Sequence, residues 1–187
     1  MNDLLLSRLL CLAPAFVFAA CGLFLLHPAA PRAVRALPRA RALGMALSAL
    51  CWVWVTAELW FHPIDFLAFL TPGMVLTLGA LCITLSWALL ENLLCARAVG
   101  GLLMLWPMPV ILAVRDQVTA WRLVPVTLGY ASLTFGMFVV FYPWLMRTVC
   151  DALAEHPAQR RAAGVGLTLA GVLCAAAAVA LGKEIGA

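Results

Sequence analysis

Apolar runs of about 20 residues recur along this chain, and its few charged residues collect in short clusters between them. The hydrocarbon core of a bilayer is about 30 Å thick, and about 20 helical residues cross it. Only 11% of the residues are charged, against about 25% in a typical soluble domain. The mean hydropathy of +1.07 is also that of a strongly apolar chain. The pattern therefore predicts an all-α, polytopic integral membrane protein with about six transmembrane helices.

Six apolar stretches have the length of a membrane span. The predicted spans are 4–26, 42–61, 66–90, 98–114, 123–145 and 162–182. They use most of the chain, so we expect short loops and a single membrane domain over 1–187. After Cys21 the first run continues apolar to Leu26, with no polar start of a mature chain, which favours an uncleaved span over a signal peptide. Any function must then come from the helices, their ends or a partner.

Basic residues are distributed unevenly between the two sides of these spans. Eight flank one side: Arg32, Arg35, Arg39, Arg41, Arg97, Arg147, Arg160 and Arg161. Four flank the other: Arg8, Arg115, Arg122 and Lys183. Cytoplasmic loops carry an excess of Lys and Arg, so both termini are predicted outside, in the periplasm. The preference for Arg over Lys and the abundance of Ala indicate a bacterial inner membrane.

The most specific pattern is Arg-Ala-x-Gly-x-x-Leu, which occurs three times, each time at the start of an even-numbered span. Its Arg and Gly positions are Arg41 and Gly44, Arg97 and Gly100, and Arg161 and Gly164. The Arg anchors the helix end at the head groups, and the Gly one turn later permits close helix approach. We interpret the copies as three parallel helical hairpins, 1–61, 62–115 and 116–187. The alternative is that residues common at bacterial span starts recur by chance.

Small residues four apart mark faces on which helices can pack closely. They are Ala162, Gly166 and Ala170, with Gly171 and Ala175, in span 6; Ser132 and Gly136 in span 5; and Gly73 and Thr77 in span 3. We expect these faces to pack within the chain. The alternative is that spans 5 and 6 use them to bind a membrane-protein partner or a second copy.

Proline interrupts spans 3 and 4 at similar depth, roughly 10 Å below the predicted outer surface at 1.5 Å per residue. Broken helices at membrane depth can line a binding site. We therefore consider an outward-facing apolar pocket suited to a lipid, quinone or isoprenoid. Its residues would be Thr71, Pro72, Gly73, Met74, Trp106, Pro107, Met108 and Pro109. The alternative is two ordinary proline kinks in a packed core.

No catalytic motif is present in this sequence. The spans lack a central charged residue, which is unfavourable for an ion-coupled pump. The seven Cys are spread singly, and the His62-x-x-Asp65 spacing is interrupted by Pro63. We expect no enzyme activity, no metal, no cofactor and no nucleic-acid partner. The sequence favours a non-enzymatic scaffold or accessory subunit in the lipid bilayer, with a small transporter or lipid- or quinone-binding protein as the alternative.

Overall fold

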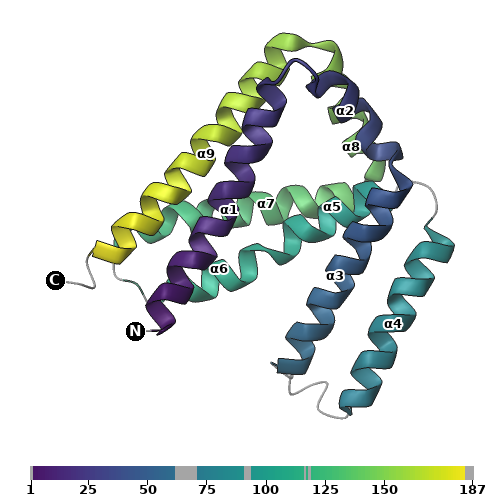
Figure 1. Cartoon of the computed structure of the whole chain (residues 1–187), viewed down its shortest axis with the longest axis horizontal. Helices are drawn as coiled ribbons and strands as arrows, with labels where there is room; N and C mark the ends of the chain where they lie inside the picture. The colour runs from purple at the N-terminus through teal and green to yellow at the C-terminus, as the bar shows by residue number, and fades with distance from the viewer. Residues whose placement is uncertain (1, 62–70, 91–93, 116, 118, 184–187) are drawn as a thin grey trace.

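The computed structural model describes residues 2–61, 71–90, 94–115, 117 and 119–183. Every regular element in these residues is a helix, which confirms the all-α prediction (Figure 1). The α-helices are α1 (Asn2–Leu26), α2 (Ala30–Ala36), α3 (Arg41–Phe61), α4 (Pro72–Leu89), α5 (Leu94–Leu105), α6 (Pro107–Val114), α7 (Leu123–Phe141), α8 (Pro143–Glu155) and α9 (Pro157–Lys183). Short 3-10 turns, η1 (Leu37–Arg39) and η3 (Ala120–Arg122), precede α3 and α7.

Within the described residues, five helical segments are long and apolar enough to cross a membrane. They are Arg41–Phe61, Pro72–Leu89, Leu94–Val114, Ala120–Phe141 and Pro157–Ala180. A sixth is added if Leu12–Leu26 and Ala30–Arg39 count as one span, although the chain bends by 114° between them. Residues 66–70 of the predicted third span lie outside the described residues.

The predicted fifth span is too long at its end. We expected a helix to Leu145, but α7 ends at Phe141, and α8 starts at Pro143 after a non-helical Tyr142 with φ −121° and ψ 72°. Proline lacks the backbone donor that would continue the preceding helix, and it disfavours a helical conformation at the residue before it. The segment after Tyr142 is thus a separate helix rather than an extension of the span.

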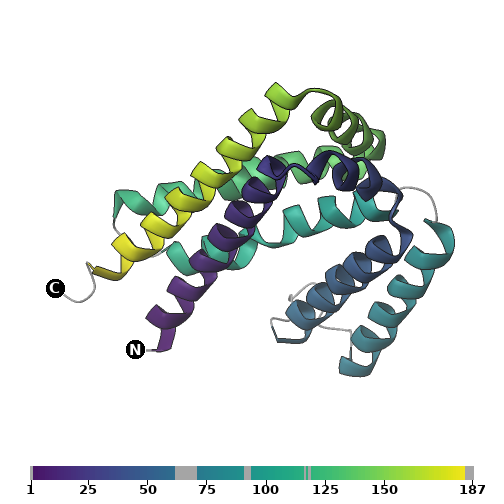
Figure 2. The same cartoon turned by 45° about the horizontal axis from the view of Figure 1, so that its top comes forward.

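The helix pairing differs from the order of the helices along the chain. The most extensive contacts join α1 to α9, α5 to α7 and α3 to α5, while α4 packs chiefly against α3. Figures 1 and 2 show α1 and α9 side by side, with the α3–α4 pair standing apart from them. Each of these pairs joins segments from different predicted hairpins. The three-hairpin division therefore stays a prediction about ancestry.

Each glycine of the Arg-Ala-x-Gly repeat is buried where two helices cross. A Cβ on Gly44 would lie 2.7 Å from the backbone nitrogen of Cys95, and one on Gly100 would lie 3.0 Å from the carbonyl oxygen of Gly136. A Cβ on Gly164 would lie 3.0 Å from the carbonyl oxygen of Gly22. Only a residue without a side chain permits these backbone-to-backbone approaches. The repeat thus marks three crossings: α3 with α5, α5 with α7, and α9 with α1.

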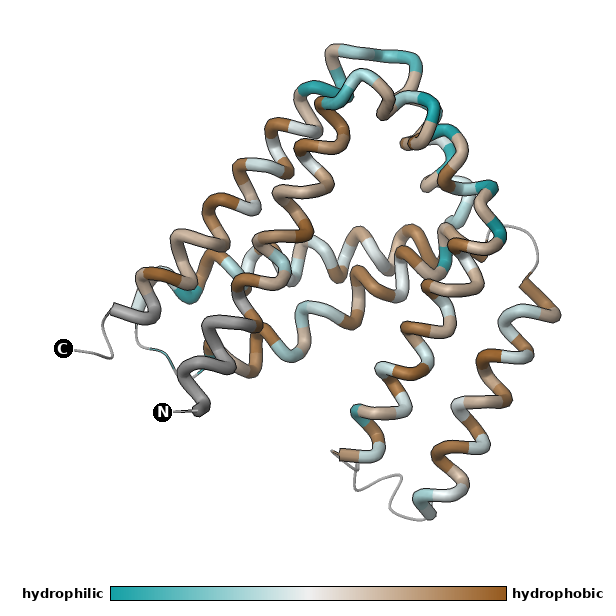
Figure 3. Tube along the Cα trace, in the orientation of Figure 1, coloured by the Kyte–Doolittle hydropathy of each residue, from teal (hydrophilic) through white to brown (hydrophobic). Residues whose placement is uncertain are grey.

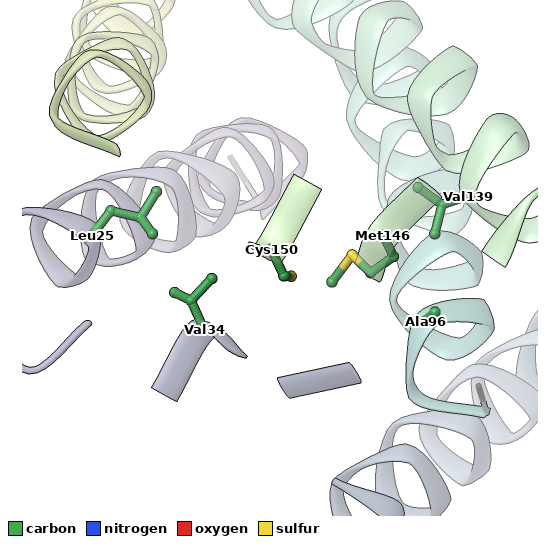
Figure 4. Packing of buried hydrophobic residues seen from close by; sticks show 6 residues of the cluster. All are labelled: Leu25, Val34, Ala96, Val139, Met146 and Cys150. Carbon is green, nitrogen blue, oxygen red and sulfur yellow. The ribbon is translucent and has the colours of Figure 1, made fainter. Parts of the chain in front are cut away.

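Polar residues gather at one end of the helix assembly. In Figure 3 the hydrophilic colour follows α2, α8 and the start of α9, and the start of α1 lies with the end of α9 at the opposite side. Beneath this polar end lies an apolar cluster that joins five helices (Figure 4). Its members are Leu25, Val34, Ala96, Val139, Met146 and Cys150. The short helices α2 and α8 are therefore part of the packed structure.

Candidate functional site

The first half of the predicted pocket lies at the start of α4. Thr71 precedes the helix with φ −68° and ψ 154°, and Pro72 is its first residue. Proline suits this position because its missing backbone donor has no partner in a first turn. Met74 is 53% exposed, and a Cβ on Gly73 would meet no atom within 4 Å. Pro72 thus begins a helix here, and these residues form an open helix end.

The second half of the predicted pocket is packed. Trp106 lies where α5 ends and α6 begins, and its indole nitrogen donates to the Ser132 hydroxyl of α7 at 2.6 Å. The indole also meets the Phe18 ring of α1 edge-on, with centroids 5.4 Å apart. Pro107 is fully buried, and its Cβ lies 3.2 Å from the position of a Cβ on Gly129. The Trp106 segment therefore ties α1, α6 and α7 together.

The structure does not bring the two halves together. Among the principal helix contacts, α4 packs against α3, whereas α6 packs against α7, α1 and α5. Figures 1 and 2 both show α4 and α6 in separate parts of the molecule. Equal depth along two spans does not make them neighbours, because lateral position depends on which helix faces are complementary. Met108 is exposed and Pro109 is half-buried, and both belong to α6, away from the α4 residues of the predicted pocket.

Three hydrogen bonds from tryptophan to serine join helices inside the apolar region. Ser48, Ser86 and Ser132 are the buried polar residues of the described chain. Trp52 of α3 donates to Ser86 of α4 at 2.8 Å, and Trp87 of α4 donates back to Ser48 of α3 at 3.1 Å. With Trp106 and Ser132, every one of these serines accepts an indole donor. We had not predicted these pairs, although Trp within an apolar run is a signal for such a bond.

The reciprocal bonds hold α4 in register on α3, and a groove lies beside them. It has a volume of about 510 Å³ and runs between the second half of α3 and the first half of α4. Its lining is Val53, Thr56, Ala57, Trp60, Phe61, Leu76, Gly79, Ala80 and Ile83. A Cβ on Gly79 would collide with the Thr56 hydroxyl, and that hydroxyl donates to the carbonyl oxygen of Trp52 at 2.6 Å. Because the Thr56 hydroxyl is bonded within its own helix, the groove offers an apolar surface. It lies away from the polar end of the molecule.

The described cysteines are unpaired, and Cys150 of α8 is buried with 4% of its surface exposed. Burial, with smaller contributions from the Asp151 carboxylate and from Cys95, raises the pKa of the Cys150 thiol to about 11. A thiol with so high a pKa is protonated at neutral pH and is a poor nucleophile. Its position beside Leu25 and Met146 in the apolar cluster is that of a packing residue.

We expect Cys150 to resist alkylation in the folded protein. At pH 8 a thiol of pKa about 11 has about 100-fold less thiolate than one of pKa 9.0. The rate with iodoacetamide should rise about tenfold per pH unit up to about pH 11. A variant that keeps Cys150 as its one cysteine would be followed by mass spectrometry, with the same variant unfolded as the control. Fast modification of the folded variant at pH 8 would contradict this assignment.

No group of three His, Cys, Asp or Glu side chains suited to a metal ion occurs among the residues that the structure describes. His62 and Asp65 lie outside those residues. No protein-family model matches this chain, and no curated protein or solved structure matches it either.

Proposed function

We propose that this protein is a non-enzymatic, multi-pass scaffold or accessory subunit of a bacterial inner membrane, with α3 and α4 as its arm for a membrane-protein partner. The observation that carries this proposal is the uneven packing of the helices. Only 11% of the α3 span and 17% of the α4 span are buried, against 28% for each of the three other long spans. Among these five spans, the two of the arm thus have the most open helix surface.

One face of α4 suits close contact with another helix. Gly73 and Thr77 lie four residues apart, so they share that face. A Cβ on Gly73 would meet no atom within 4 Å, and the Thr77 hydroxyl donates to the carbonyl oxygen of Met74 at 3.0 Å. The face is therefore small, internally satisfied in hydrogen bonding and uncovered. In lipid, helices associate through such close packing, since burial of apolar surface gives little gain there.

Most other small-residue faces are already used within the chain. A Cβ on Gly136 of α7 would lie 2.7 Å from the carbonyl oxygen of Gly100, and one on Gly171 of α9 would lie 2.7 Å from that of Ala15. Gly166 of α9 is the exception, because a Cβ there would meet nothing within 4 Å. Among the glycines that the structure describes, two therefore mark open faces for a partner: the Gly73–Thr77 face of α4 and the Gly166 face of α9.

The proposed orientation places the arginine-rich end in the cytoplasm and both termini in the periplasm. Supporting it, α2, η1, α8 and the start of α9 carry six of the eight predicted cytoplasmic arginines at one end: Arg32, Arg35, Arg39, Arg147, Arg160 and Arg161. An excess of basic residues at one end is typical of the cytoplasmic side. The groove between α3 and α4 then opens toward the outer leaflet.

A second candidate function is binding of an apolar molecule in that groove. Its volume of about 510 Å³ lies in the range of small-molecule sites, and its lining is aliphatic and aromatic apart from Thr56. An isoprenoid chain or a lipid acyl chain has the matching chemistry. Filling the groove from the α3 side through Ala57→Phe is expected to remove such a ligand while leaving the Gly73–Thr77 face of α4 unchanged.

The test is affinity purification from native membranes, with mass spectrometry of retained proteins and lipids. Wild type should retain one membrane protein at near-equal stoichiometry, and Thr77→Leu should lose it because the added bulk blocks close approach. The matched control is Gly166→Leu, which adds bulk to the open face of α9. If the partner were lost with Gly166→Leu and retained with Thr77→Leu, the interface would lie on α9 instead. A wild-type preparation without any protein partner would contradict the scaffold proposal, and a ligand lost with Ala57→Phe would favour the second candidate.

A further inference from the structure

A recess at the polar end of the molecule is lined by three arginines from one short segment. It has a volume of about 560 Å³, and its lining consists of Arg32, Arg35, Ala36, Arg39 and Ala40. The arginines are three and four residues apart, so successive ones lie on the same helical face. The alanines supply an apolar surface between the guanidinium groups.

The segment that carries the recess turns sharply away from the preceding span. The chain bends by 114° between Leu12–Leu26 and Ala30–Arg39. Ala30, Val34 and Pro38 of this segment are buried, whereas its three arginines are exposed. The apolar face of this segment packs into the protein, and its basic face follows directly on the end of a span, where Arg side chains reach the membrane interface. Its arginines are then at the level of the lipid head groups.

The charges around the recess are only partly compensated. Arg35 pairs with two carboxylates of α8: its Nη2 lies 2.9 Å from Glu155 Oε1, and its Nε lies 3.9 Å from Asp151 Oδ1. These contacts hold the middle arginine against α8. Arg32 and Arg39 have no acidic partner within 4.0 Å in the described part of the chain. Two uncompensated guanidinium groups therefore flank a fixed one.

We propose that this recess binds the phosphate head group of an anionic phospholipid, with Arg32 and Arg39 as its ligands. The planar guanidinium donors match the oxygens of a phosphate, which can accept two hydrogen bonds from one Arg. Basic pockets beside spans are suited to anionic head groups. Leu26 and Leu43, which flank the segment, are 41% and 39% exposed and provide apolar contact for acyl chains. The inference depends on the membrane-spanning arrangement but not on a protein partner.

The test compares lipid binding by purified variants in nanodiscs and by native mass spectrometry. The recess variant is Arg32→Gln with Arg39→Gln, and the control is Arg147→Gln with Arg161→Gln. The control removes the same charge from the same end without altering the recess lining. Wild type and control should prefer phosphatidylglycerol over phosphatidylcholine, whereas the recess variant should bind phosphatidylglycerol about tenfold more weakly. All four positions are exposed, and size-exclusion chromatography checks that both variants are folded.

Three results would overturn the proposal. Equal weakening in the two variants would indicate diffuse attraction of anionic lipid to this end of the protein. Equal binding of both lipids by wild type would show that the recess does not select an anionic phospholipid. The melting temperature of delipidated protein would also be measured with glycerol 1-phosphate alone. If glycerol 1-phosphate raised the melting temperature as much as phosphatidylglycerol does, the recess would be a site for a soluble phosphate instead.

Discussion

Gly171→Leu is expected to lower the free energy of unfolding by about 3 kcal/mol, because it forces α1 away from α9. A Cβ at this position alone would lie 2.7 Å from both the carbonyl oxygen of Ala15 and the backbone nitrogen of Ala19. Both obstacles are backbone atoms, which cannot rotate out of the way as a side chain can. The α1–α9 pair has the most extensive helix contact in the structure, so its separation should affect the whole assembly.

The matched control for this prediction is Gly166→Leu, on the same helix. A Cβ there would meet no atom within 4 Å, so the change in the free energy of unfolding should stay within about 0.5 kcal/mol. Both variants would be unfolded by SDS titration in mild detergent and followed by tryptophan fluorescence. Equal stabilities for the two variants would show that α1 and α9 do not approach as closely as described.

Trp106→Ala is expected to cost about 3–5 kcal/mol, in the range found for large-to-small changes of aromatic residues in a core. The substitution removes the hydrogen bond to Ser132 and the edge-on contact with Phe18 together. It also leaves a cavity beside Pro107, which is fully buried. The effect is large because one side chain joins α7 to α1 at the point where α5 meets α6.

Trp106→Phe separates the hydrogen bond from the packing. It keeps an aromatic ring and should cost only about 1 kcal/mol, since Ser132 retains its bond to the carbonyl oxygen of Leu103 at 3.1 Å. Trp144→Ala serves as the control, because Trp144 is 59% exposed and contacts the Tyr142 ring. The same SDS titration measures all three variants. A Trp106→Ala variant as stable as Trp144→Ala would refute the joining role.

Much of the local structure followed from the sequence. The predicted span 42–61 differs from Arg41–Phe61 by one residue, and the span ending at 114 agrees with the end of α6 at Val114. These predictions succeed because hydropathy acts on each segment separately. The apolar run continues past Pro143, so the fifth span was placed to end at about Leu145, whereas α7 ends at Phe141 and Pro143 begins α8.

The candidate site was far less predictable. The proline-containing segments of α4 and α6 share a predicted depth, but only the helix pairing shows that they are apart. The recess around Arg32 and Arg39 was visible in the sequence only as positive charge near a span end. Its shape depends on the bend after Leu26 and on the contact of Arg35 with Glu155 of α8, 120 residues later in the chain.

The sequence by itself determined that the chain is helical, apolar enough to cross a membrane, and basic at one end of its spans. Its glycines also indicated where helices could approach closely. Only the tertiary structure decided that α1 pairs with α9, that Trp52 and Trp87 exchange hydrogen bonds with Ser86 and Ser48, and that α4 keeps an open face. The physical reason is that lipid solvates every apolar face equally well, so hydropathy does not distinguish neighbours. Shape complementarity and a few interhelical hydrogen bonds select them.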